Sequence, residues 1–403
     1  MPKLVQINVA SNCGSTGKIA EQIGGLMKAK GWESYIVHAQ RYSRPTILTD
    51  LSTSSSLTEK AHYFGSLLTD GQGLYSRNTT KDLVRKLEEI KPDVVHLHNI
   101  HGSFMNYPVL FEYMKRTAVP VVWTLHDCWS FTGHCVYFDR IGCEKWREQC
   151  EHCPQKESYP KSFVDRSKRN YNLKKYLFAS LNDITLVPVS DWLHGLVAKS
   201  FLGKYPIKTI HNGIDLTTFR PSDNTFRREH DIEKKFIILG VADGYGDRKG
   251  LSEFNRLAEE LDDDVRIVMV GLEEKEKKQV SSKIIAMGRT KNQQELVNIY
   301  SCADVYINPT YEDNFPTTNI EALACGTPVI TYKTGGSPEA VDDNTGIVVD
   351  KGDYQGLKQA IKLIRERGKA AFAEVCRERA ERCFNKDDRY EEYLRLYEEV
   401  IKR

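Results

Sequence analysis

The chain has 403 residues, which is more than one ordinary hydrophobic core accommodates, so we expect two domains. Its composition is that of a globular protein, and no apolar run approaches the roughly 20 residues that a membrane-spanning helix needs. A formal net charge of +2 provides no overall positive field and argues against a nucleic-acid-binding protein.

The N-terminal half alternates predicted strands and helices, the pattern of a doubly wound parallel sheet. Its first strand, residues 4–9, has no signal peptide before it. We therefore expect a cytoplasmic protein whose ten cysteines are reduced or metal-bound. Four more strands are expected at residues 34–39, 93–98, 119–126 and 184–190.

The loop after the first strand, Asn12-Cys-Gly-Ser-Thr-Gly-Lys18, superficially looks like the phosphate-binding loop of an ATPase. Asn12 stands in the place of the first glycine, and Ile19 replaces the hydroxyl residue that would bind Mg²⁺. We interpret the loop as a flexible strand-to-helix turn. Gly14 lets its backbone approach a bound phosphate or sugar.

Histidines gather at the ends of two predicted strands. His126 lies at the carboxyl end of the strand at 119–126, where side chains face the ligand crevice of an open α/β sheet; a hydrogen-bonded structural histidine is the alternative. His96 and His98 share one face of their strand, and His101 follows. They would suit a metal, but no further ligand type stands nearby in the sequence, so we assign them to the core or to the acceptor side.

Four cysteines lie within 19 residues, in an insertion at about residues 128–160 that contains a C-x₂-C pair. We predict that they form a tetrahedral structural zinc site, with free thiols or a redox pair as the alternative. Such an ion would fold a segment too small to build its own core. His134 and Cys128 are substitute ligands. The predicted ligands are Cys135, Cys143, Cys150 and Cys153.

Residues 161–175 form a basic stretch that we expect to be helical, with an apolar side that includes Tyr171. Such a helix is either solvated or lies on an anionic membrane surface.

The C-terminal half starts a second series of strands and helices with a strand at 235–242. Arg248 and Lys249 then lie in a loop between this strand and the next helix. They suit an anion site, and two solvated loop cations are the alternative. Further strands are expected at 265–271 and 283–287.

The stretch from residue 303 to 332 predicts strand, loop, short helix and strand. Thr318 is expected to cap the helix. The loop at 312–317 therefore lies at a strand's carboxyl end and a helix's amino end, where free N–H groups bind anions. Asp313 and Glu321 bracket it with seven residues between them. The alternatives are a turn residue for Asp313 and a capping box between Thr318 and Glu321.

This last pattern, with Ala322-Leu-Ala-Cys-Gly-Thr-Pro-Val329 and Gly335-Gly-Ser-Pro-Glu339 after it, resembles the E-x₇-E motif of retaining GT-B glycosyltransferases of the GT4 type. Asp313 replaces the usual Glu, and Pro316 replaces a usual Gly. The resemblance covers nearly the whole chain and includes Ser190-Asp-Trp-Leu193 and His211-Asn-Gly-Ile-Asp215.

The resemblance implies a GT-B fold, an α/β architecture of two doubly wound Rossmann-like domains that face each other across a cleft. Residues 1–212 would form the acceptor-side domain, onto which the C-terminal helix 387–403 packs back. Residues 213–386 would bind the nucleotide sugar.

The resemblance also implies roles for single residues. Lys249 and Arg248 would neutralise the departing diphosphate, Arg248 standing in for a family arginine whose place Asp243 takes. Glu321 would hold the ribose, and Asp313 a donor hydroxyl. His126 would contact the donor sugar near the reacting carbon. Further donor contacts would come from Gly14, Gly288, Asn314, Phe315, Thr317 and Thr318.

We thus expect transfer of a sugar from a UDP- or GDP-sugar to a glycan or lipid-linked acceptor in surface-polysaccharide assembly, at the inner face of the membrane. Catalysis would need no cofactor, because fixed cations and N–H groups would replace a divalent ion. The alternatives are a nucleotide-sugar epimerase and a non-catalytic, zinc-containing protein that binds sugar nucleotides.

Overall fold

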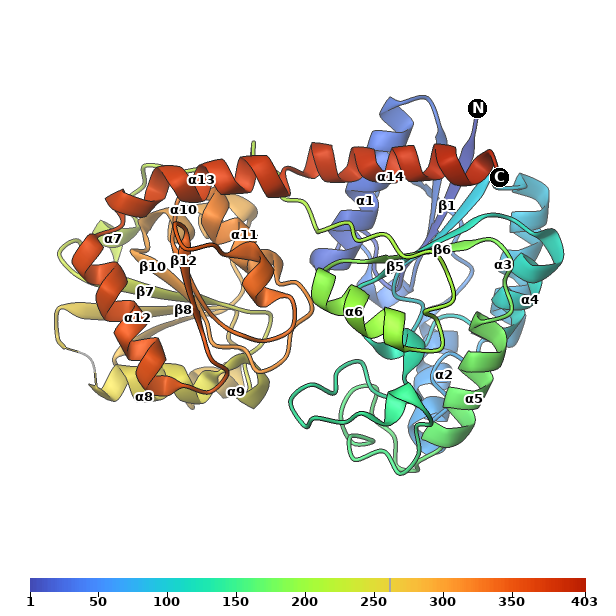
Figure 1. Cartoon of the computed structure of the whole chain (residues 1–403), viewed down its shortest axis with the longest axis horizontal. Helices are drawn as coiled ribbons and strands as arrows, with labels where there is room; N and C mark the ends of the chain where they lie inside the picture. The colour runs from blue at the N-terminus through green and yellow to red at the C-terminus, as the bar shows by residue number, and fades with distance from the viewer. Residues whose placement is uncertain (261) are drawn as a thin grey trace. The chain divides into compact units, whose positions relative to one another are not determined.

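A computed structural model describes residues 1–260 and 262–403. The chain divides into two compact units. Unit 1 comprises residues 1–211 and 389–403, and unit 2 comprises residues 212–388. Each unit is built on a six-stranded parallel sheet with helices packed around it (Figure 1).

The sheet of unit 1 has the strand order β3-β2-β1-β4-β5-β6. The chain proceeds outward from β1 in one direction and then from β4 in the other, so the order reverses between these two neighbours. Their loops therefore open at the point where ligands bind in such sheets. The strands are β1 (Lys3–Ile7), β2 (Glu33–Val37), β3 (Thr49–Asp50), β4 (Val94–Leu97), β5 (Val121–Leu125) and β6 (Ile184–Pro188).

Three helices of unit 1 begin at a side-chain cap. Ser55, Asn106 and Ser190 each accept a backbone N–H bond in the first turn of the helix that follows. The first six helices of the unit are α1 (Gly14–Ala29), α2 (Ser56–Thr69), α3 (Arg77–Ile90), α4 (Tyr107–Thr117), α5 (Ser167–Phe178) and α6 (Asp191–Lys199).

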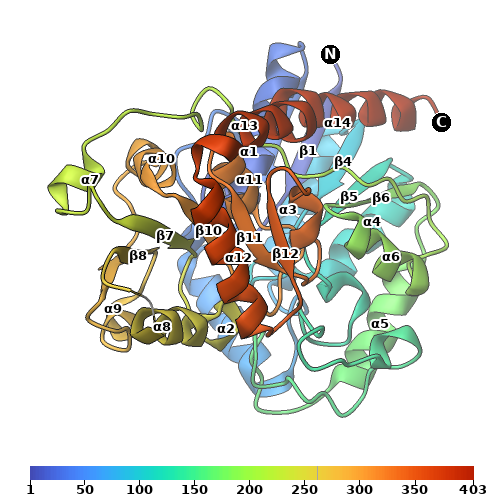
Figure 2. The ribbon, with the colours of Figure 1, turned by 60° about the vertical axis from the view of Figure 1, so that its left-hand side comes forward.

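The last helix, α14 (Lys386–Ile401), belongs to unit 1 from residue 389 onward. Its apolar stripe packs into the same core as Leu4 of β1 and Ile23 of α1, and Figures 1 and 2 show it beside these elements. The buried members of the stripe are Tyr390, Tyr393, Leu396, Tyr397 and Val400.

Unit 2 repeats the design, with the order β12-β11-β10-β7-β8-β9 and its reversal between β7 and β10. Its strands are β7 (Phe236–Val241), β8 (Val265–Val270), β9 (Ile284–Met287), β10 (Val305–Asn308), β11 (Val329–Tyr332) and β12 (Gly346–Val349). Its helices are α7 (Phe226–Glu229), α8 (Leu251–Glu260), α9 (Glu274–Lys277), α10 (Gln293–Cys302), α11 (Thr317–Ala324), α12 (Tyr354–Arg367) and α13 (Ala370–Phe384).

The structure corrects two local predictions. Thr318 does not cap α11, because the helix already begins at Thr317 with Pro316 as its N-cap residue. The basic stretch is helical only from Ser167, where α5 begins, and Lys174 is buried instead of facing solvent.

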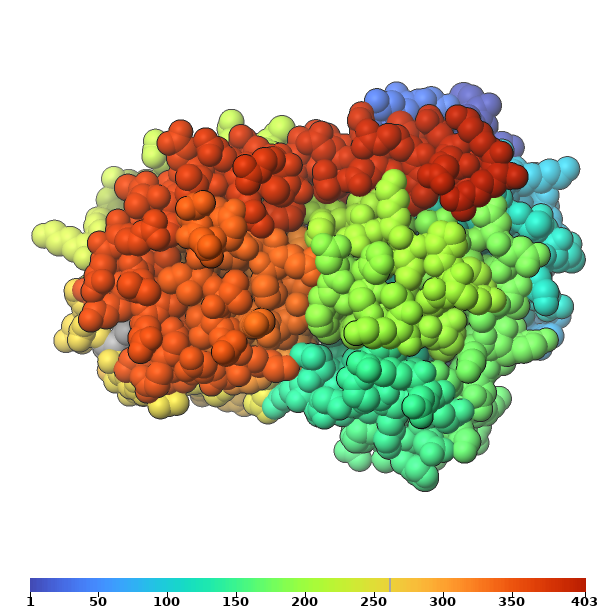
Figure 3. Space-filling model, in the orientation of Figure 1, coloured from blue at the N-terminus to red at the C-terminus, as the bar shows by residue number. Residues whose placement is uncertain are grey.

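The segment between β5 and α5 contains two short 3₁₀ turns, Trp129–Phe131 and Lys145–Arg147, as its helical parts. Figure 3 shows it, in teal, as a lobe at the lower edge of unit 1. No described helix is long and apolar enough to cross a membrane.

Candidate functional site

The reversal of strand order in unit 2 brings the loops after β7 and β10 together. Lys249, in the first loop, lies 2.5 Å from the Oδ2 atom of Asp313, in the second. Their side chains are only 20% and 14% exposed. Asp313 Oδ1 also accepts the N–H of Asn314 at 2.9 Å. Two residues that lie 64 positions apart thus form a partly buried ion pair in front of α11.

Arg248 fastens the two loops to each other. Its Nη1 donates to the carbonyl of Glu312 at 3.0 Å, and its own carbonyl accepts the N–H of Tyr311 at 2.8 Å. Gly250 then has a φ of +72°, and a Cβ there would lie 2.5 Å from the carbonyl oxygen of Pro309. Only glycine allows this close approach.

Glu321 lies on α11 and accepts a hydrogen bond from the hydroxyl of Tyr300, 3.0 Å from its Oε2. The capping-box alternative is wrong, because the N-cap residue Pro316 has no backbone N–H for Glu321 to satisfy. Thr318 instead accepts a bond from the hydroxyl of Tyr306, at 2.8 Å.

The loop before α11 is supported from behind. Gly335 has a φ of +55°, and a Cβ there would lie 1.6 Å from the carbonyl oxygen of Asp313. The N–H of Gly336 donates to the carbonyl of Asn314 at 3.0 Å. Asn314 and Phe315 themselves are 2% and 5% exposed. The Gly335-Gly336 pair therefore holds this loop in one conformation.

Sequence reasoning missed a buried amide pair beneath this loop. Asn308, at the end of β10, donates to the side chain of Asn319 at 2.8 Å, and Asn319 donates to the carbonyl of Ser337 at 3.1 Å. A polar residue at the end of a strand that is otherwise apolar was the available signal. Gly288, the other predicted donor residue of unit 2, lies directly after β9 beside Arg289, which forms an exposed ion pair with Asp243.

In unit 1, His126 belongs to a chain of side-chain hydrogen bonds. Gln6 donates its amide N–H to the carbonyl of Ala20, so its oxygen accepts from His98 Nε2 at 3.1 Å. His98 Nδ1 then accepts from His126 Nε2, also at 3.1 Å. His126 thus carries its proton on Nε2, and any hydrogen bond at its Nδ1 is one that the ring accepts. Burial lowers the pKa of His126 to about 4, which keeps the ring neutral at pH 7.

The other histidines have structural partners. His96 is buried in the core, where its Nδ1 is hydrogen-bonded to the hydroxyl of Tyr397 (2.6 Å) and its Nε2 to the hydroxyl of Thr124 (2.8 Å). His101 Nε2 lies 2.8 Å from Asp127, next to His126 in the sequence. Gly14 opens α1 with a φ of +63° and space around its Cβ position, at the carboxyl end of β1.

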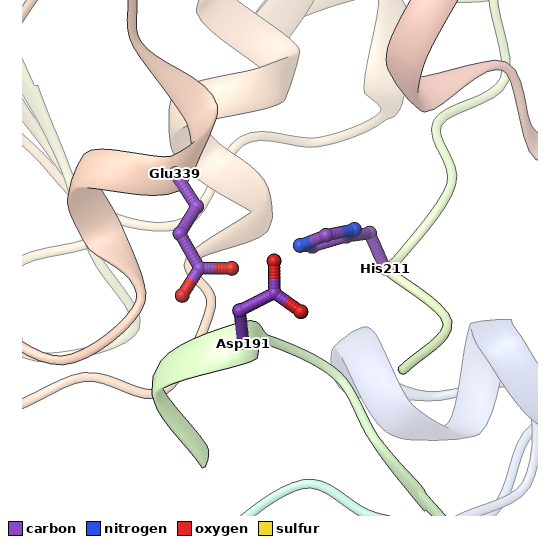
Figure 4. Close-up of side chains that lie close together, drawn as sticks. All are labelled: Asp191, His211 and Glu339. Carbon is purple, nitrogen blue, oxygen red and sulfur yellow. The ribbon is translucent and has the colours of Figure 1, made fainter. Parts of the chain in front are cut away.

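The Ser190-Asp-Trp-Leu193 and His211 motifs meet within unit 1. Asp191 is the first residue of α6, and its carboxylate lies within 4.8 Å of a ring nitrogen of His211 (Figure 4). Glu339, labelled in the same figure, belongs to unit 2. Two groups in unit 1 are too few for a metal site.

The four cysteines of the insertion line one cavity of 20 Å³ together with His134. Cys135 and Cys153 are hydrogen-bonded to each other. Among the described residues, however, no three of the four sulfurs lie within 4.8 Å of one another. The cysteines share a cavity but do not form a closed set of metal ligands.

Comparison with known proteins identifies the family of the chain. The profile of the family Glycosyl transferases group 1 matches residues 222–382, and that of Glycosyltransferase Family 4 matches residues 20–218. WcaC of Escherichia coli K12, assigned to colanic acid biosynthesis as a glycosyl transferase, is 26% identical over 319 residues, 77% of each chain.

The N,N'-diacetylbacillosaminyl-diphospho-undecaprenol alpha-1,3-N-acetylgalactosaminyltransferase of Campylobacter jejuni is 26% identical over 202 residues, 47% of this chain and 53% of that protein. Among solved structures, Anabaena Alr3699/HepE in complex with UDP-glucose aligns with a TM-score of 0.68 at 14% identity, covering 98% of this chain and 99% of the other. The two family matches leave only short parts of the chain unmatched. The chain belongs to the GT4 family of retaining glycosyltransferases and has the GT-B fold.

Proposed function

We propose that this glycosyltransferase moves a sugar from a nucleoside-diphosphate sugar to a lipid-linked acceptor in surface-polysaccharide assembly. A UDP-sugar is the preferred donor, and a GDP-sugar is the second candidate. The donor class is supported by the UDP-glucose complex of the Anabaena neighbour. The acceptor class is supported by the functions of the Escherichia and Campylobacter relatives. The reaction would take place at the cytoplasmic face of a membrane.

The observation that carries the proposal is the ion pair between Lys249 and Asp313 before the first turn of α11. A cation between the end of a strand and the start of a helix is suited to a diphosphate, because helix N–H groups and the helix dipole add to its charge. On donor binding, the diphosphate would replace Asp313 as the partner of Lys249. Asp313 would then accept a hydrogen bond from a hydroxyl of the sugar.

The remaining roles follow from donor and acceptor chemistry. Glu321, already held by Tyr300, accepts hydrogen bonds and suits the ribose hydroxyls. The backbone around Asn314, Phe315, Thr317 and Thr318 would supply N–H donors to the phosphates. His126, neutral and protonated on Nε2, accepts at Nδ1 and suits a sugar hydroxyl. Negative charge that develops on the departing diphosphate would be stabilised by Lys249 and Arg248 without a divalent ion.

A surface of unit 1 supports a membrane-borne acceptor. Leu57, Phe64 and Leu68 follow each other at helical spacing along α2 and are 78%, 59% and 61% exposed. Phe163 is 57% exposed and lies beside this helix face, because its backbone N–H donates to the carbonyl of Leu67. We call these four side chains the α2 surface. The side chain of Lys60 falls on the same helix face between Leu57 and Phe64.

This arrangement favours an anionic membrane as the partner. Apolar side chains inserted at the headgroup boundary and flanking cations are the two contributions on which peripheral membrane binding depends. Lys161 adds a second cation, 6.0 Å from the ring of Phe163. Membrane contact was one of the two alternatives for residues 161–175, and this proposal assigns it to α2 and the segment at Lys161 and Phe163, not to α5 with its buried Lys174.

Release of nucleoside diphosphate from a panel of UDP- and GDP-sugars, with and without EDTA, tests the donor. Turnover that persists in EDTA is expected. Tight donor binding without release or transfer would instead indicate the non-catalytic alternative, and interconversion of free nucleotide sugars would indicate the epimerase.

Sedimentation with lipid vesicles tests the acceptor side. Vesicles containing phosphatidylglycerol should bind the protein, whereas purely zwitterionic vesicles should bind it weakly. The double variant Leu57→Ser/Phe64→Ser should bind at least ten times more weakly, and Leu363→Ser, at a 52% exposed position of α12, should bind as the unchanged protein does. Equal binding by both variants would refute the membrane contact.

A further inference from the structure

We propose that the insertion between β5 and α5 holds one zinc ion, ligated by His134 Nε2 and by thiolates of its cysteine cavity, with Asp70 orienting the histidine. The starting observation is a buried imidazole with one end occupied. His134 Nδ1 lies 2.6 Å from the carboxylate of Asp70, and the two side chains are 0% and 2% exposed. The Nε2 atom has no hydrogen-bond partner among the described residues.

A buried ring nitrogen without a partner is rare, because water satisfied it in the unfolded chain. His134 lines the same cavity as Cys135, Cys143, Cys150 and Cys153. A carboxylate that holds one ring nitrogen of a histidine, while the other nitrogen is left for the metal in a cavity lined by thiols, is an arrangement that proteins use around zinc. Asp70 makes Nδ1 the protonated nitrogen, which leaves the lone pair on Nε2 for the ion.

Asp70 is itself built into the insertion. Its second oxygen accepts the N–H of Arg166 at 2.8 Å, and its carbonyl accepts the side-chain amide of Asn170 at 2.6 Å. It sits at the C-terminal end of α2 with a φ of +53°. The carboxylate therefore has a fixed position relative to both ends of the insertion, and with it the ring of His134.

Binding of the ion would draw the ligand atoms of the cavity closer together. Ligand atoms around a tetrahedral zinc with Zn–S bonds of about 2.3 Å stand about 3.8 Å apart. Among the described residues, no three ligand atoms of the cysteines and His134 lie within 4.8 Å of one another, so the side chains around the 20 Å³ cavity must move inward. Cys135 and Cys153 already contact each other. Each thiol that binds releases one proton to solvent, and no oxidant is needed.

The site is structural in this proposal. The lobe has few helical turns, and its rings of Phe131, Phe138 and Trp146 pack on one another beside the cavity. A fourfold set of protein ligands would leave no position for a substrate. The zinc would fix the lobe, and donor cleavage would not pass through it.

Metal analysis of the full-length protein, purified without chelator, tests the proposal. One zinc per chain is expected. His134→Gln and Cys143→Ser should lose the ion, and Asp70→Asn should bind it 10 to 100 times more weakly. Cys383→Ser, at a cysteine of α13 outside the insertion, is the matched control and should keep one zinc per chain.

A second measurement avoids variants that fail to fold. Cobalt exchanged into the unchanged protein should give the absorption of a tetrahedral ion and a sulfur-to-cobalt charge-transfer band. A protein that binds neither metal, or whose peptide map shows a Cys135–Cys153 disulfide, would overturn the proposal. So would His134→Gln and Asp70→Asn variants that hold zinc as tightly as the unchanged chain.

Discussion

Replacing Lys249 by alanine tests the central contact of the proposed donor site. In the structure the ammonium is 2.5 Å from Asp313, with both side chains more than three-quarters buried. The intact pair contributes little net stability, because desolvation of both groups offsets most of their attraction, but removal of Lys249 alone leaves the carboxylate of Asp313 without its cation. Asp313 retains the N–H of Asn314 after the substitution. We therefore expect the free energy of unfolding to fall by about 1 to 3 kcal/mol.

The effect on turnover should be larger. A fixed cation that meets charge developing on the diphosphate acts mainly in the transition state. Loss of one such group costs about 3 to 4 kcal/mol of activation free energy, or a factor of about 10² to 10³ in kcat. Lys249→Arg, which keeps the charge, should recover part of this loss.

Nucleoside diphosphate release at saturating donor, with Tm measured on the same samples, separates the two effects. Lys362→Ala, at an exposed lysine of α12, is the control and should change neither quantity. A loss of kcat below about tenfold for Lys249→Ala would refute the reasoning, because an ordinary loop cation costs no more than that.

The remaining predictions concern unit 1. Burial lowers the pKa of His126 from 6.5 to about 4 and that of His62 from 6.5 to about 3. Below pH 6.5 the unfolded chain therefore binds more protons at these two histidines than the folded chain does. The free energy of unfolding, measured with urea at several pH values, should be highest above pH 6.5 and fall as the pH drops toward 4. Tyr397→Phe leaves His96 Nδ1 buried without its partner and should lower the free energy of unfolding by about 1 to 3 kcal/mol, whereas Tyr176→Phe, at a 72% exposed position, should have no effect. Gln6→Leu removes the acceptor for His98, so His126 should no longer be held with its proton on Nε2, and the ¹⁵N shifts of its ring should change. We expect kcat/KM to fall while Tm changes little. Unchanged ¹⁵N shifts would contradict the role of Gln6 in fixing the tautomer.

Much of the fold could be predicted from local patterns. Alternating strands and helices indicated two parallel sheets, and the apolar stripe of the last helix indicated that it packs on a core. The strand order of each sheet agrees with the doubly wound architecture. These features depend on periodicity and chain direction, which the sequence displays directly.

The errors have local physical causes. Thr318 looked like a cap, but Pro316 takes the N-cap position two residues earlier and the helix begins at Thr317. Lys174 looked like a solvated cation, but its ammonium donates to the carbonyls of Trp129 and Thr132 inside the insertion. A lysine buried against carbonyls has no sequence pattern of its own.

The side-chain networks were beyond sequence reasoning for a different reason. Gln6 is 92 residues from His98, and Asp70 is 64 residues from His134. Nothing at either position alone indicates its partner. Such pairs arise from the order of strands and from the path of the insertion, so they can be found only once the chain is folded.

The position of α14 bears on the order in which the chain can mature during synthesis. Unit 1 combines residues 1–211 with residues 389–403, and this second part is synthesised only after the whole of unit 2. Until residues 389–403 emerge, the apolar surface around Leu4, Val94 and Val187 has no cover, whereas unit 2 already has its whole sequence. Unit 2 can therefore complete its folding before unit 1 does. A nascent chain, or one truncated before residue 389, would expose an apolar surface of the kind that chaperones bind.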